Sequence, residues 1–187
     1  VETSRPIPLI TPSAASRSTV LARFAACPRP WFALGIGSSE AFKQWGTDNF
    51  ADLAGALLQR YGGSCFLLGG ASEQAMADAI AQRAAGQGTL APLIQAPLQE
   101  VIALLAEAQL FVGNDTGMLN LSAACGAHSI GLFGHTVSAW VASSSPRIHP
   151  VYPDAGLSSE GVTQIHLPAV LQMINQQESL YGLEAHR

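Results

Sequence analysis

Short apolar runs along the chain alternate with segments in which apolar residues recur every three or four positions. The first pattern is typical of buried strands and the second of amphipathic helices. The runs predict strands over residues 31–35, 65–68, 90–94, 110–113, 129–133 and 147–152. The spaced segments predict helices over residues 47–61, 72–85, 97–106, 117–125 and 167–177. This alternation indicates β-α-β units and a parallel sheet with helices on both faces.

The ends of the predicted helices carry capping and turn residues. Thr47 or Asp48 can cap the first helix, and Gly62 follows its last turn. Ser72 is expected to cap the second helix, and Pro97 suits the first turn of the third. We therefore predict an α/β fold, a Rossmann-like three-layer parallel sheet.

The beginning of the chain has a different composition. Residues 1–29 are rich in proline, serine and alanine, and prolines fix φ and remove backbone donors. We predict a linker-like segment there, in which residues 18–26 could form a short helix. Residues 30–187 then form one domain, since ~100–200 residues is the usual domain size. The chain begins with Val1, and we expect it to be a piece of a longer protein.

Composition narrows the classes of function. Charged residues make up 12% of the chain, about half the usual ~25%. This scarcity favours a surface that faces another domain, another subunit or a lipid surface. A net charge of −4 argues against nucleic acid as a partner. No apolar run approaches the ~18 residues of a membrane span, so membrane association is expected to be peripheral at most.

Metal and nucleophile motifs are missing from the sequence. The three cysteines lack metal-ligand spacing and are interpreted as small hydrophobic residues in a reducing compartment. The five histidines are His128, His135, His149, His166 and His186. They show no H-x-H or H-x-x-x-H spacing, and no G-x-S-x-G motif occurs in the sequence. We expect no metal and no permanently bound cofactor.

The candidate chemistry lies in turns that follow predicted strands, where ligands bind in parallel sheets. In residues 113–117, a tight polar turn precedes a helix whose first N–H groups can bind a phosphate. Asp115 or Thr116 can cap that helix, and Gly117 lets a ligand approach the backbone. The alternative is that Asp115 is simply a cap and Gly117 simply a turn residue.

Two other turns add candidates. Residues 35–39 form a Gly/Ser turn, and Lys43, the only lysine, could reach a diphosphate from it. The alternative for Lys43 is a solvated loop residue. In the turn at 69–73, Glu73 could accept hydrogen bonds from ribose hydroxyls, or could simply favour a helix N-terminus.

Taken in order, these segments resemble the carboxy-terminal half of the ADP-heptose:lipopolysaccharide heptosyltransferases, glycosyltransferase family 9. The resemblance covers about residues 30–177, and its most specific part is Asn-Asp-Thr-Gly at 114–117. Its segments are 32–58, 67–70 with Glu73, 98–105, 108–117, 123–126 and 132–134.

The resemblance implies a GT-B architecture, of which this chain is the donor-binding half. It implies that Ser38, Ser39 and Lys43 lie near the donor diphosphate and that Glu73 lies near the ribose. It also implies that residues 115–117 present a helix N-terminus to the phosphates. The donor would be an ADP-sugar, typically ADP-heptose. Transfer to the lipopolysaccharide core or a related glycan would invert the anomeric carbon, with the leaving diphosphate stabilised by Lys43 and helix N–H groups.

The chain departs from the family pattern at several positions. Asn120 stands where the family usually has histidine; we include it in the donor site as a hydrogen-bond donor that cannot carry an imidazolium charge. His128 and His135 stand where proline is usual. The family's amino-terminal domain, which binds the acceptor and supplies the general base, is absent. We therefore name no catalytic residue and expect the isolated chain to be inactive.

Two other hypotheses compete with the donor-binding half. A catalytically silent glycosyltransferase-like domain used for protein interaction or assembly is favoured by Asn120 and the sparse charge. It predicts association with a partner and no nucleotide binding. The other competing hypothesis is a different Rossmann-like enzyme that acts on a nucleotide sugar, such as an epimerase of the GT-B type. For the first hypothesis, the resemblance implies a cytoplasmic location, at the inner face of the bacterial inner membrane.

Overall fold

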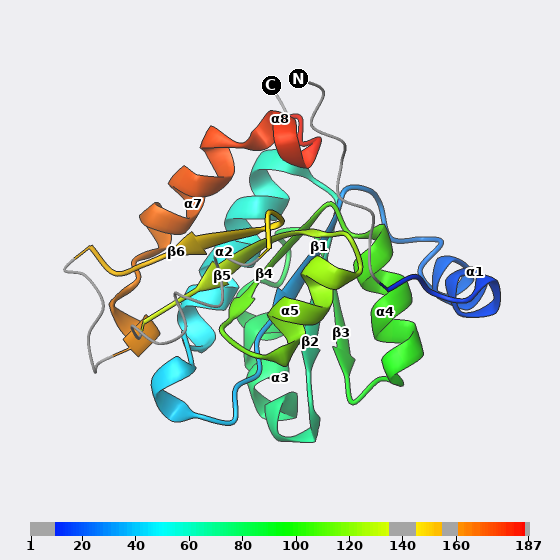
Figure 1. The fold of residues 1–187 in the computed structure, drawn as a ribbon, viewed down its shortest axis with the longest axis horizontal. Coiled ribbons are helices and arrows are strands. Elements are labelled where there is room, and N and C mark those ends of the chain that lie inside the picture. Colours follow the sequence, from blue (N-terminus) through cyan, green and yellow to red (C-terminus); the bar gives the residue numbers. More distant parts are fainter. Residues whose placement is uncertain (1–9, 135–144, 155–160, 186–187) are drawn as a thin grey trace.

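The fold is built on one parallel β-sheet. The computed structural model describes residues 10–134, 145–154 and 161–185. Its six strands are ordered β3-β2-β1-β4-β5-β6 and all neighbours are parallel (Figure 1). They are β1 (Trp31–Gly35), β2 (Ser64–Gly69), β3 (Thr89–Ile94), β4 (Leu110–Asn114), β5 (His128–Leu132) and β6 (Ile148–Val151). The chain adds β2 and β3 on one side of β1 and then β4, β5 and β6 on the other side. The switch point between β1 and β4 is where parallel sheets bind ligands.

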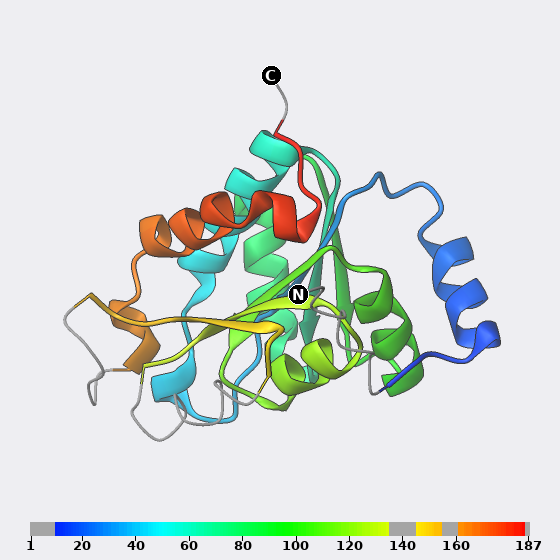
Figure 2. The same ribbon diagram turned by 45° about the horizontal axis from the view of Figure 1, so that its top comes forward.

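Helices cover both faces of this sheet (Figures 1 and 2). One hydrophobic core joins the sheet to α2 (Thr47–Tyr61), α3 (Gln74–Arg83) and α7 (Leu167–Gln176), with α8 (Glu178–Tyr181) at its end. The other joins it to α1 (Ala14–Arg23), α4 (Leu98–Glu107) and α5 (Gly117–Ala124). Three short 3₁₀ turns complete the described elements: η1 (Ala41–Lys43), η2 (Ala71–Glu73) and η3 (Gly161–Gln164).

The predicted α/β class and the three-layer parallel sheet are confirmed. The five residues 31–35 form β1 as predicted, and the other strands differ from prediction by one or two residues. The reason is visible in the burial: β1, β4 and most of β2 are buried on both faces, so their sequences are continuous apolar runs. The cysteine interpretation also agrees in part, since Cys65 and Cys125 are buried thiols.

The segment predicted as linker-like contains a docked helix. Of residues 1–29, the first nine lie outside the described residues. Helix α1 starts four residues earlier than the predicted short helix because the Ser13 side chain accepts a hydrogen bond from the Ser16 N–H. Val20 is fully buried and α1 packs against α4. Prolines flank the helix without interrupting it, which is why the composition of the whole segment was misleading.

The predicted helix over residues 72–85 begins differently. Residues 71–73 form η2, and α3 starts at Gln74, so Ser72 is not its cap. The Ser72 hydroxyl instead donates to the Glu73 carboxylate at 2.8 Å, and the same carboxylate accepts the Gly70 N–H at 2.7 Å. Among the described residues, no helix is both long and apolar enough to cross a membrane.

Candidate ligand-binding site

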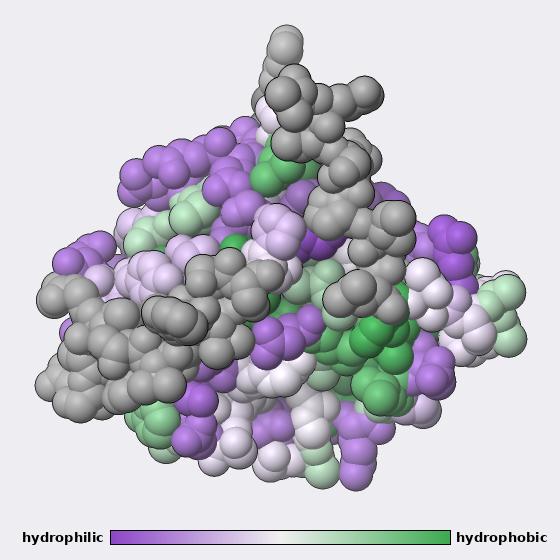
Figure 3. Space-filling view, viewed as in Figure 1, coloured by the Kyte–Doolittle hydropathy of each residue, from purple (hydrophilic) through white to green (hydrophobic). Residues whose placement is uncertain are grey.

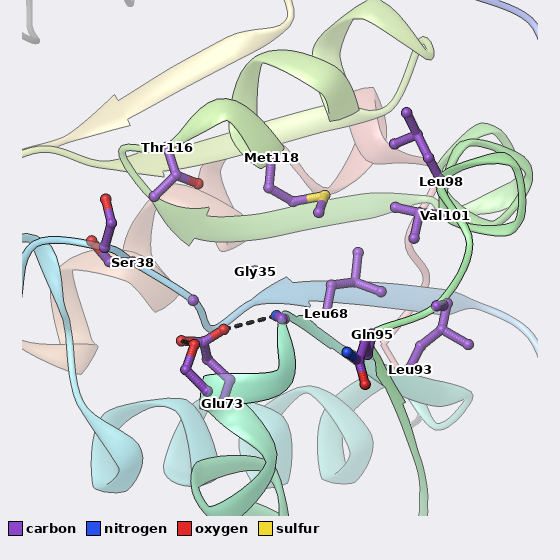
Figure 4. Close-up of a pocket in the computed structure, with 16 residues that line it drawn as sticks. Gly35, Ser38, Leu68, Glu73, Leu93, Gln95, Leu98, Val101, Thr116 and Met118 are labelled. Carbon is purple, nitrogen blue, oxygen red and sulfur yellow. Dashed lines mark hydrogen bonds between the residues drawn. The ribbon is translucent and has the colours of Figure 1, made fainter.

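A cavity of about 530 Å³ lies at the carboxyl edge of the sheet, beyond β1, β2 and β3 and beside the starts of α4 and α5. One end of it is polar and the other apolar (Figure 4). The polar end is lined by Ser38, Ser39, Glu73 and Thr116. The apolar end is lined by Leu68, Leu93, Leu98, Val101 and Met118. A ligand with a charged or hydroxylated part and a flat apolar part would suit both ends.

Glu73 is fixed at the polar end by its own turn. Its two carboxylate oxygens accept hydrogen bonds from the Gly70 N–H at 2.7 Å and the Ser72 hydroxyl at 2.8 Å. A carboxylate has about four acceptor positions, so both oxygens can accept further hydroxyls. Gly37 comes so close that a Cβ there would lie 3.1 Å from Glu73 Oε2. A side chain at position 37 would therefore crowd the Glu73 carboxylate.

The N-terminus of α5 opens beside this polar end. Thr116 is the N-cap residue by backbone position, but neither it nor Asp115 caps the helix with its side chain, contrary to our expectation. The first N–H groups of α5 therefore keep their capacity to bind an anion. Nothing lies within 4 Å of a Cβ built on Gly117, so the backbone there is open to a ligand.

Lys43 connects the Gly/Ser loop to this helix start. Its Nζ lies 2.7 Å from Glu40 Oε2 and 3.6 Å from Asp115 Oδ2. The hydrogen bond to Glu40 raises the pKa of Lys43; burial opposes this, and the charge of Asp115 adds to it. Lys43 is thus a cation held next to the α5 N-terminus rather than a freely solvated loop residue.

Asn114, which the sequence analysis did not single out, organises the loop. Its side chain is fully buried at the end of β4. The Oδ1 atom accepts the Trp45 N–H at 3.1 Å, and Nδ2 donates to the Ile36 and Gly37 carbonyls, both at 3.2 Å. Nδ2 also lies 2.9 Å from Gln44 Oε1. One buried amide therefore holds both ends of the loop that carries Ser38 and Lys43. Its place in the Asn-Asp-Thr-Gly segment was the available signal.

The apolar end was also missed by the sequence analysis. Gln95 has a φ of 56°, an uncommon value for a residue other than glycine, and lines the cavity together with Leu98. The Leu98 side chain is 60% exposed at the start of α4. Figure 3 shows hydrophobic surface gathered at this place beside α5. The residues come from β3, its loop and α4, and no motif marks such a surface in the sequence.

The predicted site residues fall into three groups. Ser38, Ser39, Glu73 and Thr116 line the cavity. Lys43, Asp115 and Gly117 border the Thr116 turn without lining the cavity. Asn120 is exposed one turn further along α5 and is not brought to the cavity. The predicted turn at 134–136, with His135, lies almost wholly outside the described residues. Within the described ranges, no group of three or more potential ligands could hold a metal.

The fold and the cavity define a Rossmann-like α/β domain with a ligand site at the switch point of its sheet. The model of the family described as glycosyltransferase family 9 (heptosyltransferase) matches residues 3–155. The chain belongs to this family, as the resemblance indicated.

Solved structures agree with this fold. The chain is similar to E. coli ADP-heptose lipopolysaccharide heptosyltransferase II, with 19% identity and a TM-score of 0.69, over 95% of this chain and 56% of that one. It is also similar to E. coli heptosyltransferase WaaC with ADP-2-deoxy-2-fluoro heptose, with 21% identity and a TM-score of 0.68, over 86% of this chain and 47% of that one. A family 9 glycosyltransferase from Veillonella parvula has 16% identity and a TM-score of 0.70, over 97% of this chain and 55% of that one.

The chain therefore spans about half the length of these structures. The comparison with curated proteins gave no match.

Proposed function

We propose that this chain is the donor-binding half of an inverting glycosyltransferase whose donor is an ADP-sugar, specifically ADP-heptose. The single observation that carries the proposal is the two-ended cavity at the switch point of the sheet. Its polar end is lined by Glu73 and Thr116, at the N-terminus of α5, and Lys43 lies beside this end, 3.6 Å from Asp115. Its apolar end offers the surface that a base needs.

Each part of the nucleotide has a matching group. The diphosphate would lie between the Ser38 and Ser39 turn, Lys43 and the first N–H groups of α5, which together supply positive potential and donors. The ribose hydroxyls would donate to Glu73. The base would lie against Leu98 and its apolar neighbours at the other end.

The same groups would act on the transition state of transfer. Negative charge grows on the diphosphate as the bond between the anomeric carbon and the phosphate oxygen breaks. A fixed cation and helix N–H groups at that point stabilise the developing charge without rearrangement. Attack of the acceptor from the opposite side of the sugar would invert the anomeric carbon. The proton of the acceptor hydroxyl would pass to a base outside these 187 residues.

Relatives support the choice of donor. Three of the similar heptosyltransferase structures contain ADP, ADP-2-deoxy-2-fluoro heptose and ADP-D-β-D-heptose. Those structures are 22%, 21% and 16% identical to this chain, so they supply a candidate ligand and the cavity supplies the place for it. Delivery to the lipopolysaccharide core, cytoplasmic location and association with an acceptor-binding domain are parts of the same proposal.

Calorimetric titration of the chain with ADP, UDP and GDP tests the proposal. We expect ADP to bind more tightly than UDP or GDP. Lys43→Ala should weaken the affinity for ADP at least tenfold, because it removes a charge-assisted contact. Arg83→Ala is the matched control, because Arg83 is also a cation paired with two carboxylates but lies away from the cavity. Absence of binding to all three nucleotides would favour the silent interaction domain instead.

A further inference from the structure

Gln95 brings a polar group to the apolar end of the cavity. Among the described residues that line the cavity, it is the one with an amide side chain (Figure 4). The side chains around it at this end are apolar: Leu68, Leu93, Leu98, Val101 and Met118. A few polar groups placed in an apolar pocket are what gives such a pocket its specificity.

The backbone of Gln95 is held in place directly after β3. Its N–H donates to the Gly69 carbonyl at 2.9 Å. Its φ of 56° lies in the left-handed region, which residues other than glycine adopt at a cost. The long side chain therefore starts from a fixed point at the rim of the cavity.

The side-chain amide of Gln95 is open to a ligand. The residue is exposed, and within the ranges that the structure describes its amide makes no hydrogen bond to another residue. The carbonyl oxygen can accept and the NH2 group can donate. A ligand can thus displace water from this amide without breaking a contact inside the protein.

One peptide unit connects Gln95 with the carboxylate proposed for the ribose. The carbonyl of the Gly69–Gly70 peptide unit accepts the Gln95 N–H, and the N–H of the same unit donates to the Glu73 carboxylate at 2.7 Å. Gln95 and Glu73 therefore flank a single peptide unit. In a nucleoside the base is joined directly to the ribose, so a residue that contacts the base has to lie close to one that contacts the ribose.

We propose that Gln95 selects adenine, with its Oε1 accepting from the N6 amine of the base and its Nε2 donating to N7. This inference rests on the proposed function, because it concerns the base of the same nucleotide in the same cavity. A glutamine amide pairs bidentately with N6 and N7 of adenine. Guanine presents two acceptors at the corresponding edge, so the Gln95 carbonyl oxygen would face one of them. Gln95 is thus a specificity-determining residue and takes no part in the transfer itself.

Calorimetric titration of the full chain with ADP and with inosine diphosphate tests this assignment. The two ligands share the ribose and the diphosphate, but hypoxanthine has an oxygen where adenine has the N6 amine. We expect the original chain to bind ADP about tenfold more tightly, the weight of a good bidentate contact.

Gln95→Met removes the amide and keeps the length of the side chain. It should reduce the preference for ADP over inosine diphosphate at least threefold, because a thioether cannot pair with N6 and N7. Since the residue is exposed, the variant should keep the thermal midpoint of the original chain. Gln82→Met is the matched control, because Gln82 is an exposed glutamine on α3 that does not line the cavity. It should leave the preference unaltered.

The outcomes separate this inference from the proposed function. If ADP binds and its preference over inosine diphosphate is unchanged in Gln95→Met, the role of Gln95 is wrong and the donor cavity stands. An equal loss of preference in Gln82→Met also removes the role of Gln95. If the original chain binds no ADP, both the inference and the proposed function are wrong.

Discussion

Asn114 fixes the relation between two turns that border the proposed nucleotide cavity. Its amide reaches the backbone on both sides of the Gly/Ser loop, from Ile36 to Trp45. Trp45 is itself almost fully buried and donates from its indole to the Ile165 carbonyl at 2.7 Å. The loop is therefore attached to the core at its end, and the serines and Lys43 project from a fixed base.

Replacing Asn114 with alanine should destabilise the protein and weaken nucleotide binding. The change leaves the buried Trp45 N–H without its acceptor, and we expect a loss of about 2–4 kcal/mol in the free energy of unfolding. Urea denaturation followed by tryptophan fluorescence measures it. Asn120→Ala, at an exposed site on α5, is the control and should change stability by less than about 0.5 kcal/mol. Equal effects of the two variants would contradict the role given to Asn114.

Glu73 offers a test of the ribose contact. Glu73→Gln keeps the size and one acceptor oxygen but removes the negative charge. We expect ADP affinity to fall about three- to tenfold, because hydroxyl donors bind a carboxylate more strongly than an amide. Calorimetry measures the change. Asp78→Asn, on the helix that follows Glu73 and bonded to Gln74, should leave the affinity unaltered; a drop of the same size there would remove the argument for Glu73.

At the scale of elements, ion pairs join α1 and its following loop to α4, beside the buried contact of Val20. Arg23 pairs with Glu100 at 2.6 Å, while Arg17 and Arg29 share Glu107. Burial of Glu107 favours its neutral form, but the two arginine hydrogen bonds outweigh this and hold its pKa below the usual value. The contribution of such a carboxylate is present above its unfolded pKa of about 4.3 and is lost as the pH falls through its lower folded pKa.

We therefore expect Glu107→Gln to be less stable than the original chain by about 1 kcal/mol at pH 7, since the arginines are partly exposed. The difference should shrink below about pH 4.3, as the original chain also loses its charge there. Urea denaturation between pH 3.5 and 7 measures it. A difference that stays constant or grows toward acid pH would contradict this assignment.

The elements differ in how far the sequence predicts them. Strands such as β1 and β4 are buried on both faces, so their apolar runs mark them closely. Helix α1 was obscured because prolines flank it and because Val20 is its one fully buried residue, so its apolar stripe is narrow. The start of α3 was misplaced because residues 71–73 form a separate 3₁₀ turn, in which the Ser72 hydroxyl donates to Glu73 instead of capping the helix.

The candidate site was predicted only where its residues are neighbours in the sequence. The turns holding Ser38, Glu73 and Thr116 follow strands and carry glycine, which marks each turn locally. The apolar end of the cavity is assembled from residues far apart in the chain. Leu68 and Leu98, for example, line it together because the sheet brings β2 close to the start of α4, and no local sequence pattern indicates this.

At the scale of the whole molecule, the sheet separates two edges with different chemistry. The carboxyl edge holds the proposed nucleotide cavity, whose lining includes the exposed Leu98. The amino edge holds a second cavity, whose lining includes Arg17, Arg29 and Arg147. The low content of charged residues agrees with the proposal that the longer protein covers part of this surface.

Nucleotide binding should stabilise the molecule as a whole. ADP at a hundred times its Kd adds about 2.7 kcal/mol to the folded state by mass action. For a domain of this size, the thermal midpoint should rise by about 5–11 °C. Scanning calorimetry with and without ADP measures the rise. In Lys43→Ala, the same ADP concentration should give a clearly smaller shift, and an equal shift would show that binding does not involve Lys43.

Locating the bound ADP tests the proposed donor site most directly. Amide signals of the ¹⁵N-labelled chain can be followed by NMR while ADP is added. We predict the largest shifts at Ser38, Ser39, Thr116 and Gly117, with smaller ones near Leu98 and little change at Gly126 on the opposite edge. Shifts confined to the opposite edge, or none at saturating ADP, would contradict a donor site at the switch point of the sheet.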